Sequence, residues 1–375
     1  MNQPSESSDA SSGTGPYVAK LAASNAKPAV DAQVEAQVVA ATLAHTPEQE
    51  EAVAKLHAAR ERLKQEIAKV VVGQDRVIDS LLVALLSRGH ALMVGVPGLG
   101  KTLMARTLAR ALDLEYRRIQ FTPDLMPSDI TGTDIISEDP ESGRRKLEFF
   151  RGPLFANFLL ADEINRAPPK TQAALLQAMQ ELEVSVGRST YPLSPPFFVV
   201  ATQNPVEQEG TYPLPEAQLD RFMFNIPVTY PTPAEEAQIV KSTTSNASAE
   251  LQPILTSADV LQLQKLVRGV PVANDVVDFA VAISNHTRPE VVAQKRDDLH
   301  RYIRYGASPR ASQCLVLGAK ARALLLGRFH VDFDDVRAVA SPVLRHRLVL
   351  NFHARAEGID TDEVIRRVLQ QVRPA

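Results

Sequence analysis

The chain has 375 residues and a formal net charge of −3, with 45% hydrophobic and 23% charged residues. These values are typical of a globular protein of two domains, and they argue against a broadly basic surface for nucleic acid. Cys314 is the single cysteine, which excludes an intrachain disulfide and a cysteine-based metal site.

No apolar run reaches the roughly 18 to 20 residues that a membrane-spanning helix needs. The N-terminus has no basic segment followed by an apolar core, so a secretory signal is not expected. Together with the single cysteine, these features favour a cytoplasmic location.

The first 45 residues are rich in Ser, Ala, Gly, Pro and Gln, and we expect them to form a disordered low-complexity tail. A helix is predicted to begin at Thr46, a capping residue followed by proline. From residue 46 to 230, short apolar runs alternate with amphipathic segments, which predicts an α/β domain with a parallel sheet between helices. The expected strands are 90–95, 116–121, 157–162, 197–203 and 223–228. Residues 231–375 are dominated by helical segments and are predicted to form an all-α domain.

Residues 95–102, GVPGLGKT, fit the pattern G-x-x-x-x-G-K-[ST] of a phosphate-binding loop between a strand and a helix. Glycines allow the tight turn, and backbone N–H groups then face phosphate oxygens at the positive end of the helix. Lys101 is expected to reach the β- and γ-phosphates, and Thr102 to ligate Mg²⁺. The alternative is a glycine turn with an incidental lysine. The other candidate nucleotide contacts in the loop are Gly95, Pro97, Gly98, Leu99 and Gly100.

Two acids, Asp162 and Glu163, follow the apolar run 158–160, which we expect to be a buried strand beside the phosphate loop. Ligands bind at the carboxyl ends of strands in such sheets. We therefore expect Asp162 to hold Mg²⁺ and Glu163 to polarise the attacking water. The alternative is that these acids only cap a helix.

A third buried strand is predicted to end in Thr202, Gln203 and Asn204. An amide at this position is able to hydrogen-bond both the γ-phosphate and the attacking water. Asn-Pro is also a common start of a turn, and position alone does not separate the two interpretations.

Four longer strings connect these motifs to a known family: FTPDLMPSDITGT, GPLFANFLLADEINRAPPKTQAALLQAMQE, ATQNPVEQEGTYPLPEAQLDRF and SPRAS. With them, the chain from about Glu61 to its C-terminus resembles the MoxR family of AAA+ ATPases. The resemblance implies a P-loop AAA+ core with a helical lid, and ATP and Mg²⁺ as cofactors. It also implies that the loop 71–74, with Val72 and Gly73, packs on the adenine.

By the same resemblance, Asn204 matches sensor 1, Arg221 the arginine finger and Arg310 sensor 2. An arginine finger in an AAA+ ring reaches the γ-phosphate bound by the neighbouring subunit and stabilises charge in the transition state. The alternative for Arg221 is a weak surface ion pair with Asp220 or Glu216.

Arg310 follows Ser308 and Pro309 and is expected in the first turn of a lid helix. A cation there opposes the helix dipole, which favours a nearby phosphate over a solvated arginine. The placement of the lid in this family leaves open whether Arg310 serves its own subunit's nucleotide or a neighbour's.

Two insertions, 134–150 and 183–193, have turn residues between β-prone arms and are predicted to form hairpins. The resemblance implies that they face the pore of a ring or a partner. The alternative is surface hairpins without a partner. Phe149 and Phe150 are expected in the core.

The resemblance thus implies an ATPase that hydrolyses ATP at the interfaces of a ring, with a hexamer as the expected size. It implies chaperone-like maturation of partner proteins, often together with a protein that carries a von Willebrand factor A domain. Two alternatives stay open. One is a motor that remodels nucleic acid, and the other is a scaffold that binds ATP with little turnover.

Overall fold

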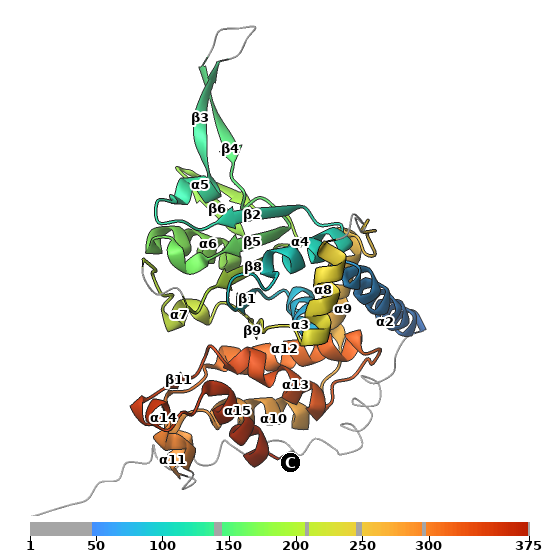
Figure 1. Cartoon of the computed structure of the whole chain (residues 1–375), viewed down its shortest axis with the longest axis vertical. Helices are drawn as coiled ribbons and strands as arrows, with labels where there is room; N and C mark the ends of the chain where they lie inside the picture. The colour runs from blue at the N-terminus through green and yellow to red at the C-terminus, as the bar shows by residue number, and fades with distance from the viewer. Residues whose placement is uncertain (1–46, 139–144, 207–209, 245–249, 295–297, 374–375) are drawn as a thin grey trace, which may run out of the picture. The chain divides into compact units, whose positions relative to one another are not determined.

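The computed structural model describes residues 47–138, 145–206, 210–244, 250–294 and 298–373 (Figure 1). The predicted tail, residues 1–45, lies outside the described residues. The described part begins with helix α2 (Pro47–Ala68), close to the predicted start at Thr46. None of the helices in these ranges combines the length and the apolar character that a membrane span requires.

Five parallel strands form the central sheet, in the order β2 (Tyr116–Gln120), β5 (Phe158–Asp162), β8 (Phe198–Gln203), β1 (Ala91–Val94) and β9 (Phe224–Pro227). Each strand overlaps one of the predicted strands, so the predicted parallel sheet is confirmed. Strands β5 and β8 are buried almost throughout because helices cover both faces of the sheet. Strand β8 lies between β5 and β1 in the sheet, an order that the sequence did not predict.

Alternate residues along the strands belong to two core clusters, one on each face of the sheet. Met93 and Val200 belong to the first cluster, and Leu92 and Val199 to the second. Helices α2, α3 (Asp75–Leu86) and α4 (Lys101–Ala111) cover the first face, and α5 (Pro127–Thr131) and α6 (Pro169–Glu181) cover the second. The sheet between helices is the predicted α/β core.

The chain after β9 is mainly helical, as predicted, and the described residues of 231–373 are called the lid below. Its helices are α8 (Pro233–Thr243), α9 (Ser257–Gly269), α10 (Asn274–Asn285), α11 (Pro289–Gln294), α12 (Pro309–Leu325), α13 (Phe333–Leu344), α14 (Phe352–Ala356) and α15 (Thr361–Gln371), with a 3₁₀ helix at Asp298–Arg301. Capping boxes begin several of them, such as the one between Thr256 and Asp259 at α9. The first core cluster continues from the sheet into the lid, and α12 contacts α2 and α3. The domain boundary at residue 230 therefore stays a proposal.

The lid also contains a short antiparallel ribbon of β10 (Ile303–Tyr305) and β11 (Val349–Leu350). Sequence analysis did not predict it, because strands of three and two residues are too short to show an alternating pattern.

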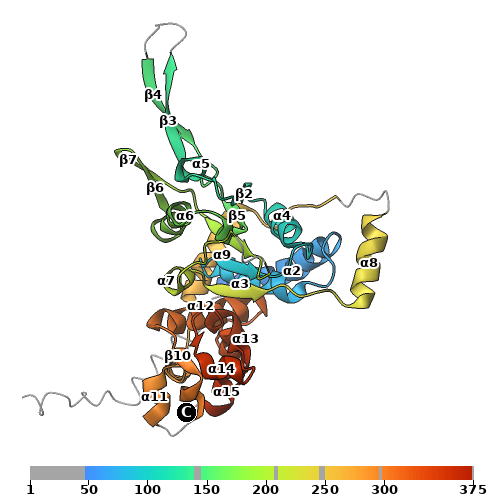
Figure 2. The same cartoon turned by 60° about the vertical axis from the view of Figure 1, so that its left-hand side comes forward.

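Both predicted insertions form antiparallel hairpins, β3 (Gly132–Glu138) with β4 (Arg145–Arg151) and β6 (Glu183–Val186) with β7 (Ser189–Pro192). The β3–β4 hairpin extends away from the sheet and its helices (Figures 1 and 2). Phe149 is half-buried and stacks on Tyr191 of β7, with the ring centroids 4.0 Å apart. Phe150 is 65% exposed, so its predicted core position was wrong. Adjacent residues of a strand point to opposite faces, and the sequence does not say which face is covered.

A buried histidine next to β8 gives the fold a specific pH dependence. His90 Nδ1 accepts from the Val199 N–H (3.1 Å), and Nε2 donates to the Met179 carbonyl (3.2 Å), which fixes the neutral tautomer. Burial lowers the pKa of His90 from its ordinary 6.5 to about 4. Below pH 6.5 the unfolded chain binds this proton and the folded chain does not, so this contribution to stability is lost as the pH falls towards 4.

We therefore expect His90→Gln to flatten the rise in unfolding free energy between pH 4 and pH 7, by up to about 3 kcal/mol. Urea unfolding at several pH values measures this. The exposed His330, replaced by glutamine, is the control and should leave the slope as in the wild type. An unchanged slope in His90→Gln would show that His90 does not carry the effect.

Candidate functional site

The predicted phosphate loop connects β1 to α4. Gly98 and Gly100 have φ values of +85° and +75°, which side chains rarely adopt, although a Cβ would meet no atom at either position. Gly95 is required for a different reason, because a Cβ there would lie 2.6 Å from the Val228 carbonyl oxygen. Helix α4 begins at Lys101, directly after the loop. The loop therefore places its N–H groups at a helix N-terminus, where anions bind.

Lys101 folds over this loop. Its Nζ donates to the carbonyl oxygens of Gly95 and Val96, at 2.7 Å each. Partial burial lowers the pKa of Lys101, while the nearby carboxylates of Asp162 and Glu163 oppose that shift. The Lys101 ammonium group thus lies close enough to the predicted metal ligand Asp162 and the predicted catalytic acid Glu163 to interact with both charges.

Asp162 lies at the carboxyl end of β5 and contacts the first turn of α4 and the end of β8. Its Oδ2 accepts from Thr102 Oγ1 (3.2 Å), and its Oδ1 accepts from Thr202 Oγ1 (2.6 Å). The two predicted magnesium ligands, Thr102 and Asp162, are therefore in contact. A hydroxyl and a carboxylate oxygen are ligands that fit Mg²⁺, which binds one or two carboxylates together with phosphate and water.

Glu163 has a left-handed backbone conformation, with φ +56° and ψ +49°, between β5 and the 3₁₀ helix Ile164–Arg166. Such a conformation is unfavourable for a residue with a side chain, so the surrounding contacts must maintain it. The Glu163 N–H donates to Thr202 Oγ1 (2.8 Å). Its carboxylate makes no capping hydrogen bond to the following helix, so the helix-cap alternative has no support for Glu163.

Three residues around these acids were missed by the sequence analysis. Arg118 donates to Asp162 Oδ2 from Nε (3.0 Å) and Nη2 (2.8 Å). Gln120 Nε2 and Arg166 Nη1 donate to Glu163 Oε2, at 2.8 Å and 2.9 Å. Strand β2, YRRIQ, lies at the edge of the sheet with both arginines exposed, so its polar side chains gave no clear signal in the sequence. Strand pairing, which the sequence does not give, places Gln120 opposite Asp162.

Asn204 follows β8 and is buried. Its Oδ1 accepts from the Val206 N–H (3.2 Å), which is the turn contact that the Asn-Pro alternative predicts. This contact uses only the amide oxygen. The NH₂ donor is not part of it, so the turn and the sensor interpretations remain compatible.

The predicted adenine loop, 71–74, packs on the chain that follows β9. Gln74 Nε2 donates to the Thr229 carbonyl (3.3 Å), next to the Val228 carbonyl that approaches Gly95. Gly73 has φ +74° and lies against the side chain of Glu235 in the first turn of α8. Val72 is half-buried beside it. One segment, 228–229, thus contacts both the phosphate loop and the predicted adenine loop.

Arg221 follows the short helix α7 (Glu216–Leu219). Its Nη1 donates to the Leu176 carbonyl of α6 (2.7 Å). It lines an open hollow of about 300 Å³ together with α6 and Gln218, and no phosphate-loop residue lines this hollow. An ion pair of Arg221 with Asp220 or Glu216 is not among the ion pairs of the described residues.

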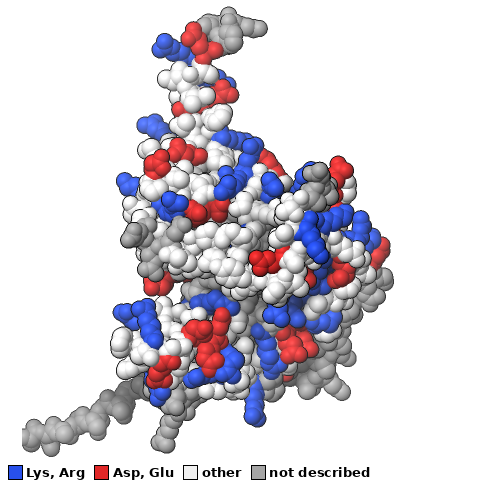
Figure 3. All heavy atoms as spheres, viewed as in Figure 1, with Lys and Arg blue, Asp and Glu red and all other residues white. Residues whose placement is uncertain are grey.

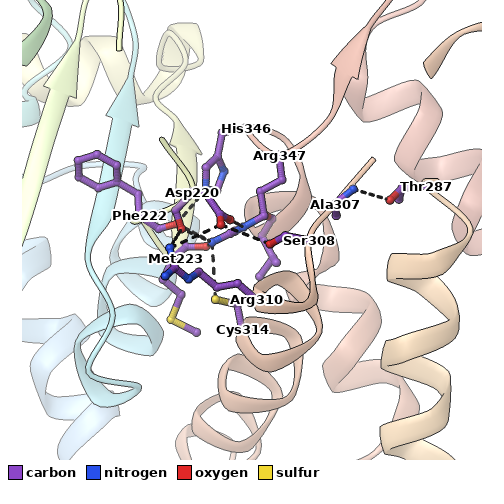
Figure 4. A network of polar contacts seen from close by, with 11 residues as sticks. Asp220, Phe222, Met223, Thr287, Ala307, Ser308, Arg310, Cys314, His346 and Arg347 are labelled. Atoms are coloured by element: carbon purple, nitrogen blue, oxygen red, sulfur yellow. Dashed lines mark hydrogen bonds and ion pairs between the residues drawn. The ribbon is translucent and has the colours of Figure 1, made fainter. Parts of the chain in front are cut away.

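Asp220 pairs instead with two arginines of the lid (Figure 4). Arg310, in the first turn of α12 as predicted, lies 3.5 Å from Asp220 Oδ2. Arg347 donates from Nε to Asp220 Oδ1 (2.6 Å). Arg310 therefore contacts the residue that directly precedes Arg221 in the chain. Among the hydrogen bonds and ion pairs of the described part of the chain, neither Arg221 nor Arg310 contacts the phosphate loop.

The charged side chains on the surface do not form a single basic field. On the face shown in Figure 3, lysine and arginine are interspersed with aspartate and glutamate. This distribution agrees with the net charge of −3 and does not favour a broad nucleic-acid-binding surface on that face.

Comparison with known proteins places these residues in a family context. Residues 90–224 match the profile described as "ATPase family associated with various cellular activities (AAA)", and residues 296–368 match an AAA lid domain. The chain is 47% identical over 313 residues to Chaperone MoxR1 of Mycobacterium tuberculosis, covering 83% of this chain and 81% of that protein. It is 36% identical over 307 residues to Protein MoxR of Paracoccus denitrificans, covering 77% and 89%. A solved structure described as a candidate ATPase of Cytophaga hutchinsonii matches with a TM-score of 0.80 and 43% identity, covering 87% of this chain and 98% of that one.

Proposed function

Since the chain belongs to the MoxR family of AAA+ ATPases, we propose that it hydrolyses ATP with Mg²⁺ at the subunit interfaces of a ring, with a hexamer as the expected size. We further propose that hydrolysis drives chaperone-like remodelling or maturation of partner proteins in the cytoplasm. The proposal of ATP hydrolysis rests on one observation. Four side chains lie together at the carboxyl ends of the strands: Lys101, Thr102, Asp162 and Glu163.

Each residue has a role that its position supports. The loop N–H groups and Lys101 would bind the phosphates, and Glu163 would orient and polarise the attacking water. Thr102 and Asp162 would hold Mg²⁺, which when bound would neutralise charge on the phosphates. Asn204, at the end of the strand between β1 and β5, would contact the γ-phosphate side of the same site.

Arg221 and Arg310 support a site shared between subunits. Arg221 lines an open hollow on α6 rather than the phosphate loop of its own chain. Arg310 contacts Asp220, the residue before Arg221, and is 46% exposed. We therefore propose that Arg221 acts on the nucleotide of the neighbouring subunit and that Arg310 lies at the same interface.

The partner is proposed to be a client protein, together with a protein that carries a von Willebrand factor A domain. A relative named as a chaperone, Chaperone MoxR1, supports the client role. The β3–β4 hairpin supports it too, because Ile136, Leu147 and Phe150 are 64% to 70% exposed on a hairpin that extends away from the sheet. Exposed apolar side chains of this kind often contact a partner.

Arg118 occupies the oxygen of Asp162 that faces Thr102, so it should compete with Mg²⁺. The pair is partly exposed, with Arg118 at 47%, and such pairs contribute at most about 1 kcal/mol. We expect Arg118→Ala to lower the Mg²⁺ concentration for half-maximal ATP turnover about two- to fivefold. A magnesium titration of turnover measures this, with Arg117→Ala as the control, because Arg117 pairs with the exposed Glu115. An unchanged or higher requirement would contradict competition at Asp162.

A mixing experiment tests the proposed shared site. Glu163→Gln subunits lack the acid and keep the finger, and Arg221→Ala subunits lack the finger and keep the acid. Each variant alone should be nearly inactive, and co-assembled mixtures should regain turnover. Mixed rings that stay inactive would contradict a site completed by the neighbouring subunit.

Two further measurements address the alternative functions. DNA binding that weakens steeply with salt would favour a nucleic-acid motor. Turnover of the wild type equal to that of Glu163→Gln would favour an ATP-gated scaffold.

A further inference from the structure

One lid arginine holds the backbone on both sides of Arg221. The Arg347 guanidinium donates from Nη2 to the carbonyls of Asp220 (3.2 Å) and Phe222 (2.8 Å) and from Nη1 to the carbonyl of Met223 (3.0 Å). Its Nε also donates to the Asp220 carboxylate (2.6 Å). Figure 4 shows these contacts converging on the segment 220–223. The segment that carries Arg221 is therefore attached to the lid at each neighbouring residue.

Arg347 is itself fixed within the lid. It follows α13, where Nη1 also donates to the Val343 carbonyl, and its Nη2 lies 3.6 Å from Cys314 Sγ of α12. The side chain is only 2% exposed. A buried charge of this kind requires a partner, and Asp220 supplies it. The position of the segment 220–223 therefore depends on the position of α12 and α13.

The neighbouring residue His346 reinforces the same attachment. Its Nε2 lies 2.9 Å from the Phe222 carbonyl, and the ring is buried. Burial and the adjacent Arg347 lower the pKa of His346 well below its ordinary value, so the ring is neutral and donates through Nε2. Ser308 and Arg310 of the lid contact the other carboxylate oxygen of Asp220.

The contacts require arginine specifically. A guanidinium offers five N–H donors in a rigid plane, which allows one side chain to reach a carboxylate and several carbonyls at once. A lysine has three donors on one nitrogen atom and cannot span the segment in the same way. Catalytic groups that are misplaced by about 1 Å lose on the order of 10² in rate.

We propose that Arg347 is a positioning residue that couples the lid to the arginine finger of the same subunit, so that lid position sets how Arg221 is presented to the neighbouring subunit. This inference rests on the proposed function of Arg221 in the shared site. Arg347 contacts no nucleotide in this scheme and acts only through the segment 220–223.

Steady-state kinetics provide the first test. Arg347→Met should lower kcat about 100-fold and change the KM for ATP less than about threefold, because the ATP site of the same subunit stays intact. Arg347→Lys should recover part of kcat. Arg345→Met is the matched control. Arg345 pairs with Asp362 within the lid and joins the lid to the sheet through the Asn225 carbonyl of β9, but none of its hydrogen bonds among the described residues reaches the segment 220–223. Equal losses in both variants would overturn the proposal.

Mixing experiments separate positioning of the finger from a defect in the subunit's own site. Arg347→Met should regain turnover when co-assembled with Glu163→Gln, which donates an intact finger. It should not regain turnover with Arg221→Ala, since both variants then lack a working finger. The reverse pattern, rescue by Arg221→Ala only, would overturn the proposal.

Two controls keep the outcome interpretable. If the mixture of Glu163→Gln and Arg221→Ala co-assembles and stays inactive, the shared site itself fails, independently of Arg347. If Arg347→Met does not fold or assemble, Arg347→Lys carries the same test, with an expected loss of about tenfold in kcat. Rescue of that variant by Glu163→Gln alone supports positioning, and rescue by neither partner overturns it.

Discussion

Replacing Glu163 with glutamine is expected to lower kcat for ATP hydrolysis by about 10³-fold and to leave ATP affinity within about threefold. A carboxylate that polarises the attacking water contributes on the order of 10² to 10⁴ in rate. Glutamine has the same shape, and its amide oxygen can still accept from Gln120 and Arg166, so the local geometry should persist. The loss therefore reports the missing base and not a rearranged site.

Single-turnover hydrolysis and fluorescent-nucleotide binding measure the two quantities separately. Glu61→Gln is the matched control, because Glu61 is an exposed acid of α2 that accepts from the Arg60 side chain. It should retain wild-type turnover. A Glu163→Gln protein that hydrolyses ATP at the wild-type rate would show that another group acts as the base, and the assignment of Glu163 would be wrong.

The centre of the sheet was predictable because its inner strands β5 and β8 are buried on both faces. Buried parallel strands read as continuous apolar runs between turns, and β5 and β8 have that form. The order of the strands was not predictable, because it depends on packing between segments far apart in the chain. The exposure of Phe150 depends in the same way on which face of the β3–β4 hairpin other elements cover.

The same distinction applies to the candidate site. The phosphate loop and the acids Asp162 and Glu163 lie in short contiguous motifs, so their pattern reveals the expected chemistry. Asp220 looked like a partner for its neighbour Arg221, but it pairs with Arg310 and Arg347, which lie far along the chain. Local spacing suggests surface ion pairs, whereas tertiary packing decides which charges meet.

Arg221→Ala is expected to lower kcat by about 10³-fold, with ATP affinity changed less than about threefold. Arginine fingers are worth factors of about 10³ to 10⁵ where they stabilise the charge of the transferred phosphoryl group. The group binds the transition state more tightly than ATP, so kcat should fall while binding persists. Among the hydrogen bonds of the described residues, the Arg221 side chain makes one, to the Leu176 carbonyl. The loss of that bond alone would cost about 1 kcal/mol of stability and little turnover.

Glu216→Gln is the control for the surface ion pair, which is not among the ion pairs of the described residues. If Arg221 served only to pair with Glu216 on α7, the two variants should have similarly small effects on turnover and on thermal unfolding. If Arg221 acts as the finger, Glu216→Gln should keep wild-type turnover while Arg221→Ala loses about 10³-fold. Arg221→Lys sharpens the comparison, because lysine keeps the charge without the planar fork and should recover only part of the rate. Full activity in Arg221→Ala would assign the arginine to packing on α6, and the open hollow would then be ordinary surface.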